Sequence, residues 1–277
     1  MKWVSVFGCL MLSGCVATQT TPLPVPSSMT FAPNTPIAER IRQVAYGEHR
    51  SWGGSFIDTS GAIRRYEVAE AERTKLTDGR PAWERVMAYW QGSGGISELS
   101  ESQNCLVGQF DPNRCRTFVL DSAWSAVFVS YVMRKAGVDG FIGSPRHFDY
   151  IKNAYDGSSP YHYADPNTTT PSVGDMLCYV RGRATSDGVV GFDGLTNYLR
   201  TQDKWLTAHC DVVVDVYDDE VWLIGGNVMN TVMLRQMAVK DGLIQLPNNH
   251  DECRHDNVQA CDFNRQNWAV LLKLNPK

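Results

Sequence analysis

The chain has 277 residues, of which 43% are hydrophobic and 20% are charged, and its formal net charge is −4. These values are ordinary for a globular protein and allow one large or two small domains. No run of Lys and Arg stands out, so we expect no nucleic-acid partner. No apolar run of membrane-spanning length follows the first residues, which excludes a transmembrane segment in the mature chain.

The N-terminus is typical of an exported bacterial lipoprotein. A positive start is followed by a short apolar stretch, and Leu12-Ser13-Gly14-Cys15 resembles a lipobox. In such proteins the cysteine, here Cys15, is acylated and becomes the first mature residue, and Val16 after it indicates outer-membrane sorting. We therefore expect a signal peptide over 1–14 and a periplasm-facing protein anchored to the outer membrane through lipid on Cys15. The alternative is an ordinary secretory signal with incidental cysteines.

A flexible linker separates this anchor from one folded domain. Residues 15–35 hold the lipidated cysteine and then a segment rich in Pro, Ser and Thr, which has little to bury. Thr35 and Pro36 are typical of an N-cap and first helical residue, and an apolar stripe continues to about Gly47. The sequence therefore predicts a single domain over 36–277 with a helical N-terminal part. A second helix is predicted over 81–90.

The strongest helix pattern covers residues 121–136 and ends at Gly137. Asp121 or Ser122 can cap its first turn, and Ser125 lies in that turn, where free backbone N–H groups favour negative charge. The helix is expected to bury one face, formed by Trp124, Val127, Phe128, Tyr131 and Val132. Taken alone, Ser125 is more often a small residue that lets the helix pack closely than a nucleophile.

Strands dominate the second half of the chain. Runs of β-branched and aromatic residues separated by turn signals cover 174–181, 209–217, 220–225, 228–234 and 268–274. Residues 144–151 predict a short helix, and 158–171 a loop. Helices followed by strands predict an α+β fold in which an antiparallel sheet packs on the central helix.

Six cysteines remain once Cys9 and Cys15 are assigned to the signal peptide and lipid. An even number in an exported chain suggests disulfides, although six cysteines allow fifteen pairings. The local pairs Cys105 with Cys115 and Cys253 with Cys261 each flank a polar loop, so we predict both. Cys178 with Cys210 is the remaining pair.

A zinc site with His250 and His255 is the less favoured alternative for the Cys253 region, and we expect no metal and no cofactor.

Three residues form a candidate catalytic set. Ser125 at a helix start, His209 at a strand start and Asn227 after the next strand supply a hydroxyl, a base near neutral pH and an amide that can orient the imidazole. Their spacing is a weak signal, because each also has a structural explanation as a cap, a strand-end histidine or a turn residue.

The order of four motifs adds a resemblance. Residues 124–131, Gly174-Asp175, His209 before an apolar strand and Gly226-Asn227-Val228 follow the order seen in papain-like cell-wall peptidases of the NlpC and CHAP group. The chain is still more similar to a bacterial family catalogued as domain of unknown function 2272, over most of residues 36–275. The resemblance implies a papain-like fold in which Ser125 replaces the catalytic cysteine, with His209 as base and Asn227 as third residue.

Serine in the cysteine position changes the chemistry. A helix terminus stabilises an anion by at most about 2 kcal/mol, roughly one and a half pKa units, which leaves a serine hydroxyl protonated. Ser125 would therefore depend on proton removal by His209, and an asparagine supports the imidazolium less well than a carboxylate. Asp211 would share a face with His209 only in a regular strand.

Two function classes follow. The first is a hydrolase of peptidoglycan peptides or other envelope amides or esters. The second is a noncatalytic envelope module that binds peptidoglycan or peptides. Trp124 and His147 are candidate substrate-binding residues, each with a packing role as the alternative.

Overall fold

The computed structural model describes residues 30–71, 73–94, 104–105, 111–182, 188–247 and 262–275. Its main feature is a nine-stranded sheet with the order β2-β1-β7-β6-β5-β4-β9-β3, and β8 pairs with β7. Every pairing is antiparallel except that of β1 with β7. The strands are β1 Ser55–Ile57, β2 Ile63–Arg65, β3 Tyr161–Ala164, β4 Met176–Val180, β5 Ala208–Val216, β6 Glu220–Val228, β7 Thr231–Lys240, β8 Leu243–Ile244 and β9 Asn267–Leu274.

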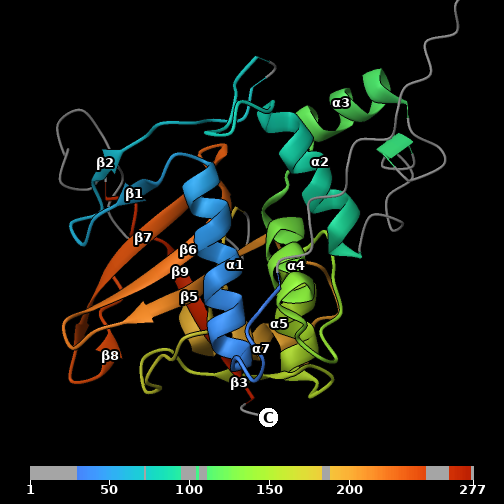
Figure 1. Ribbon diagram of the computed structural model, residues 1–277. Coiled ribbons are helices and arrows are strands. Elements are labelled where there is room, and N and C mark those ends of the chain that lie inside the picture. The colour runs from blue at the N-terminus through green and yellow to red at the C-terminus, as the bar shows by residue number, and fades with distance from the viewer. Residues whose placement is uncertain are drawn as a thin grey trace, which may run out of the picture.

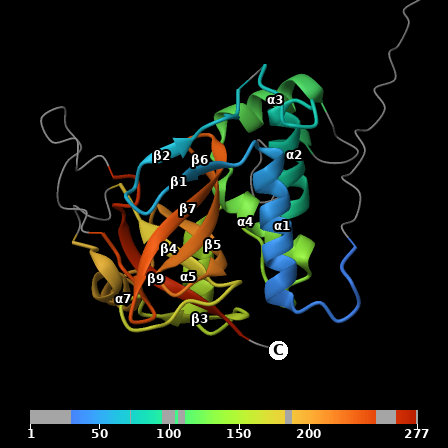
Figure 2. The ribbon, with the colours of Figure 1, turned by 60° about the vertical axis from the view of Figure 1, so that its left-hand side comes forward.

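Helices cover the central strands, as Figures 1 and 2 show. Helix α1 packs on β5, β6 and β7, α4 packs beside it on β5 and β6, and α2 covers α4 from outside. Helix α7 lies against β9. The helices are α1 Ile37–Ser51, α2 Ala82–Ser93, α3 Pro112–Asp121, α4 Ser125–Ala136, α5 His147–Tyr155 and α7 Gly191–Thr201. The predicted α+β class with an antiparallel sheet on the central helix is therefore observed.

The central helix is shorter than its pattern predicts. Residue Asp121 ends α3, whose start is capped by Asp111, and a break at Ser122 precedes α4. Helix α4 begins at Ser125 with Trp124 as N-cap, and Gly137 ends it in the left-handed conformation, as expected. Neither Asp121 nor Ser122 caps it, because the chain must turn between two packed helices. Most of α4 is buried on all sides, as in a core helix.

Small residues allow α4 to approach its neighbours closely. A Cβ on Gly226 of β6 would lie 2.4 Å from the Phe128 side chain, and one on Gly92 of α2 would lie 2.6 Å from the ring of Tyr131. Both contacts are too short for a real Cβ, so glycine is required at each position. The start of α4 is therefore fixed tightly against the sheet.

Two other predictions need correction, and one helix was missed. Helix α1 continues past Gly47 to Ser51, and Pro36 is its N-cap instead of its first residue. The predicted loop 158–171 contains the edge strand β3, because its residues pair with β9. Helix α7, which was not predicted, has its apolar residues against the sheet.

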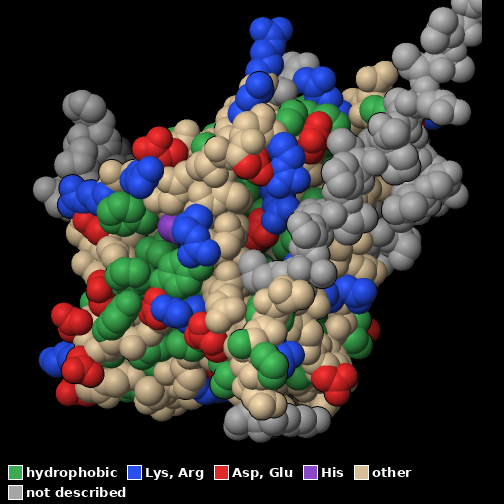
Figure 3. All heavy atoms as spheres, in the orientation of Figure 1, with side chains coloured by type: hydrophobic (Ala, Val, Ile, Leu, Met, Phe, Trp, Pro, Cys, Tyr) green, Lys and Arg blue, Asp and Glu red, His purple; other side chains and the backbone are tan. Residues whose placement is uncertain are grey.

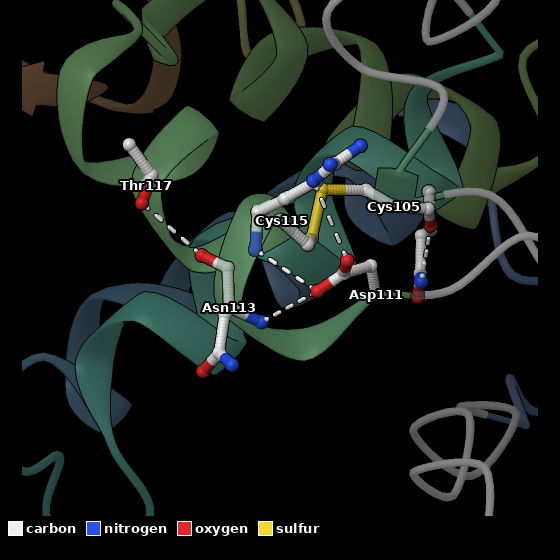
Figure 4. Close-up of a disulfide and its surroundings, with 7 residues drawn as sticks. Cys105, Asp111, Asn113, Cys115 and Thr117 are labelled. Carbon is white, nitrogen blue, oxygen red and sulfur yellow. Dashed lines mark hydrogen bonds and ion pairs between the residues drawn. A yellow bond between two sulfur atoms is a disulfide. The ribbon is translucent and has the colours of Figure 1, made fainter.

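Two disulfides join described cysteines. Cys105 pairs with Cys115, as predicted, and Cys178 with Cys210, which are directly opposite on β4 and β5. Figure 4 shows the first beside the Asp111 cap of α3.

Several predictions lie outside the described residues. They concern the signal peptide, Cys15, most of the linker, and the pair Cys253 and Cys261 with the neighbouring His250 and His255.

The visible face in Figure 3 mixes charges of both signs over its described part, with no broad basic area. Within the described ranges, no helix is both long and apolar enough to cross a bilayer.

Candidate functional site

Ser125 is the first residue of α4 and is 5% exposed. Free backbone N–H groups in the first helical turn favour negative charge near this position. Within the described part of the chain, however, the Ser125 hydroxyl makes no hydrogen bond, and none joins it to His209. The predicted nucleophile and base are therefore not in direct contact in this conformation.

His209 is instead held by a carboxylate. Its Nε2 lies 2.8 Å from Asp211 Oδ1, and the two side chains are 2% and 1% exposed. The strand is regular here, so residues two apart share a face. A carboxylate therefore orients the imidazole, which is the role that the sequence assigned to the amide of Asn227.

Arg235 of β7 completes this network. Its Nε donates to Asp211 Oδ2 at 3.1 Å, and its Nη1 donates to Asn264 Oδ1 at 2.9 Å and to the carbonyl of Phe263. Burial alone would raise the pKa of Asp211, but His209 and Arg235 outweigh it and lower that pKa to about 2. Asp211 is thus a buried anion with two partners.

The network lies on one face of the central strands, and the contact with α4 lies on the other. A Cβ on Gly225 would lie 1.8 Å from Asp211 Oδ1 and 3.1 Å from His209 Nε2, whereas Gly226 faces Phe128 of α4. Successive strand residues point to opposite faces. His209 therefore leaves β5 on the side away from Phe128, which explains why Ser125 is not bonded to it.

Asn227 has a structural reason to be asparagine. Its φ is 55°, and it lies where the β6–β7 register shifts between Gly225 and Val228. Asparagine tolerates this left-handed conformation better than most residues. In the described structure its amide makes no hydrogen bond to His209.

His147 begins α5 and packs on His209, with their ring centroids 4.8 Å apart. It is 3% exposed, and neither ring nitrogen has a hydrogen-bond partner. Burial, with a smaller contribution from His209, lowers the pKa of His147 well below its ordinary value. His147 is therefore a neutral buried ring next to the candidate base. Its burial favours the packing alternative over the predicted substrate contact.

Trp124 is fully buried, which also favours packing over a wall of an open cleft. Its indole stacks on Trp52 at 5.2 Å and donates from Nε1 to Glu70 Oε2 at 2.5 Å. Glu70 thus contacts the residue next to Ser125. Burial raises the pKa of Glu70 to about 7, and the bond from Trp124 offsets this only in part.

A groove of about 460 Å³ lies between α5 and the end of α7. Phe148 and Leu199 line it together with Trp205, which is 54% exposed, and with charged residues of both signs. Among these, Lys152 pairs with Asp203. The size of the groove falls in the range of ligand pockets. Phe148 follows His147 directly, so one end of α5 joins the groove to the His209 network.

The Gly174-Asp175 motif is structural. Asp175 is fully buried and accepts from Lys273 Nζ at 2.6 Å and from the Leu274 backbone N–H at 2.9 Å. It ties the start of β4 to β9. No group of three His, Cys, Asp or Glu side chains able to hold a metal occurs among the described residues.

Two residues of this region were missed from the sequence. Arg235 interrupts an apolar strand, and an arginine in such a run is a signal of a buried ionic partner. Glu70 gave no signal, because residues 67–72 mix three glutamates with Val and Ala, which is typical of a solvated segment. Only the packing of Trp124 shows its importance.

A family model described as "Uncharacterized protein conserved in bacteria (DUF2272)" matches residues 77–274 of the chain. No curated protein and no solved structure matches.

Proposed function

Since the chain belongs to the bacterial DUF2272 family, we propose that it is an envelope lipoprotein with a papain-like domain that hydrolyses peptidoglycan peptides or other amide or ester bonds. The observation that carries this proposal is the buried pair of His209 Nε2 and Asp211 Oδ1, 2.8 Å apart. A carboxylate in this position fixes the imidazole and stabilises its protonated form. This supports serine chemistry better than the asparagine expected from the sequence.

In the proposed reaction Ser125 Oγ bonds to the substrate carbonyl carbon while its proton passes to His209. Because Nε2 is bonded to Asp211, Nδ1 is the nitrogen that accepts the proton. The same proton then leaves with the amine or alcohol, and water releases the acyl group from Ser125. Because His209 leaves β5 on the side away from Phe128 and the start of α4 is packed tightly on the sheet, this reaction requires a conformational change larger than a side-chain rotation, which substrate binding would have to stabilise.

The test is covalent labelling of the full chain by a fluorophosphonate probe. We expect labelling of the wild type and its loss in Ser125→Ala and His209→Ala. Ser122→Ala, three residues earlier in the break before α4, is the matched control and should label normally. Ser125→Cys should gain reactivity towards iodoacetamide over the wild type. Absence of labelling together with no turnover of purified sacculi or ester panels would refute the hydrolase.

The second candidate is a noncatalytic envelope module that binds peptidoglycan or peptides. It is favoured by the missing Ser125 to His209 contact and by the 1% exposure of His209. The groove beside α5, with its exposed Trp205, would be the binding surface. Sedimentation with sacculi that is lost in Trp205→Ala but kept in Ser125→Ala would support this function.

A further inference from the structure

We propose that Glu70 is a positioning residue of the Ser125 site, held on the Trp124 indole and active in its uncharged form. The inference rests on the proposed function, because it concerns the reactivity of Ser125. Glu70 precedes the segment that the family model matches, so it comes from a different part of the chain from the candidate catalytic residues.

The first step is the mechanical link from Glu70 to Ser125. Trp124 is the N-cap of α4, and its carbonyl accepts the Phe128 N–H at 3.0 Å, which closes the first helical turn. Its indole is fixed by the bond to Glu70 Oε2 and by stacking on Trp52. A shift of the indole therefore moves the backbone that immediately precedes Ser125.

The second step is the attachment of Glu70 to the β6–β7 turn. The Glu70 backbone N–H donates to the Asn230 carbonyl at 2.6 Å. Four residues earlier, the Tyr66 hydroxyl donates to the Met229 carbonyl at 2.7 Å. The segment is therefore bonded both to the hairpin that carries Asn227 and to the start of α4, so its side chain has little freedom to turn towards solvent.

The third step is the lack of a cation for Glu70. Its Oε1 is buried without a hydrogen-bond partner, and within the described ranges Glu70 forms no ion pair. Arg73 of the same segment makes no described contact with Glu70, and the other nearby ionisable groups bond elsewhere. Glu48 pairs with Arg85, the His49 ring contacts the Ser55 carbonyl, Glu67 pairs with Arg65, and the β6–β7 turn has no charged side chain. Burial therefore acts nearly alone, and it raises the pKa of Glu70 to about 7.

The charge of Glu70 should affect the rate of reaction at Ser125. A reaction at Ser125 develops negative charge at the N-terminus of α4, which the helix dipole stabilises. An ionised Glu70 next to Trp124 would oppose that charge, whereas an uncharged Glu70 would not. Ser125 reactivity should therefore fall as Glu70 loses its proton.

The experiment is the pH profile of Ser125 labelling by the fluorophosphonate probe. In the wild type the rate should fall above about pH 7, by about two- to fivefold, the typical range of helix-terminus charge effects. Glu70→Gln keeps an acceptor for Trp124 and should remove the fall. Glu67→Gln, on the same segment, is the matched control and should keep it. An unchanged profile in Glu70→Gln would overturn the inference.

A second measurement separates this inference from the proposed function. In nitrogen-15 NMR spectra, the Trp124 indole and the Ser125 amide should shift together with an apparent pKa near 7 in the wild type but not in Glu70→Gln. If no variant is labelled at any pH, the hydrolase fails while these shifts still decide the role of Glu70. A Ser125 amide that is unaffected by the titration of Glu70 would refute the positioning role.

Discussion

Two carboxyl groups near the candidate site have opposite pKa shifts, and the extent of their burial does not explain the difference. Asp211 is fully buried yet ionised, with its pKa lowered to about 2, whereas Glu70 is only partly buried and has its pKa raised to about 7. Asp211 has two cationic or hydrogen-bonding partners, and Glu70 has one neutral donor. The comparison teaches that partners decide the charge of a buried acid.

The same difference separates a fixed part of the site from an adjustable one. The Asp211 network joins β5, β7 and the segment before β9 through several bonds, so it fixes the orientation of His209. Glu70 contacts α4 through a single indole bond and can change charge near neutral pH. Three predictions break or sharpen this contrast, and another tests the disulfides that hold the surrounding fold.

The largest effect is expected from Arg235→Met, which leaves Asp211 buried without its cation. Breaking a buried ion pair by removing one partner costs about 3–5 kcal/mol of unfolding free energy. Urea denaturation measures this loss. Arg64→Met removes a surface pair in which Arg64 is 56% exposed, and should cost less than about 1 kcal/mol. Equal losses in the two variants would contradict the contrast.

Removal of the two described disulfides should destabilise the chain unequally. Cys178 and Cys210 are 32 residues apart in sequence, and Cys105 and Cys115 are 10 apart. Loop-closure entropy predicts losses of about 3.7 and about 2.7 kcal/mol respectively. Paired Cys→Ala variants under urea test the order. A larger loss at Cys105 would show that strain or residual structure outweighs loop length.

Acid should remove the contribution of Asp211. Its pKa is lower in the folded chain than the ordinary value of 3.8, so its contribution is present above that value and is lost as pH falls towards about 2. The expected loss is about 2 kcal/mol. Urea midpoints measured over this acid range should fall steeply in the wild type and less so in Asp211→Asn. Parallel slopes would refute the assignment.

A rise in pH should remove the stabilising contribution of Glu70, and this loss of unfolding free energy is the smallest of the four expected effects. Its pKa is raised from 4.5 to about 7 in the folded chain, so stability is highest below the unfolded value and is lost as pH rises through about 7. Allowing for partial exposure, we expect a loss of about 1 kcal/mol. Glu70→Gln should be less sensitive to pH across this interval, and an equal slope in both proteins would contradict the prediction.

Local signals predicted the main elements well. The apolar stripe of α4, the glycine that ends it and the existence of five principal strands were readable from short-range patterns. The bounds of one hairpin were wrong: the strand predicted over 228–234 begins at Thr231 and continues to Lys240, because β6 extends to Val228. The break at Ser122 was not, because the apolar spacing runs across it and only the separate packing of α3 and α4 on α2 divides the two helices. Strand β3 was hidden for a similar reason, since its order depends on pairing with β9.

By itself, the sequence determined an α+β domain, placed Ser125 in the first turn of its central helix and placed His209 near a strand start. These features depend on residue periodicity and turn chemistry, which neighbours along the chain decide. The tertiary structure decided which groups meet: Asp211 with His209, Arg235 with Asp211, and Glu70 with Trp124. Those contacts join residues brought together by strand register and helix packing, and register and packing are properties of the whole fold.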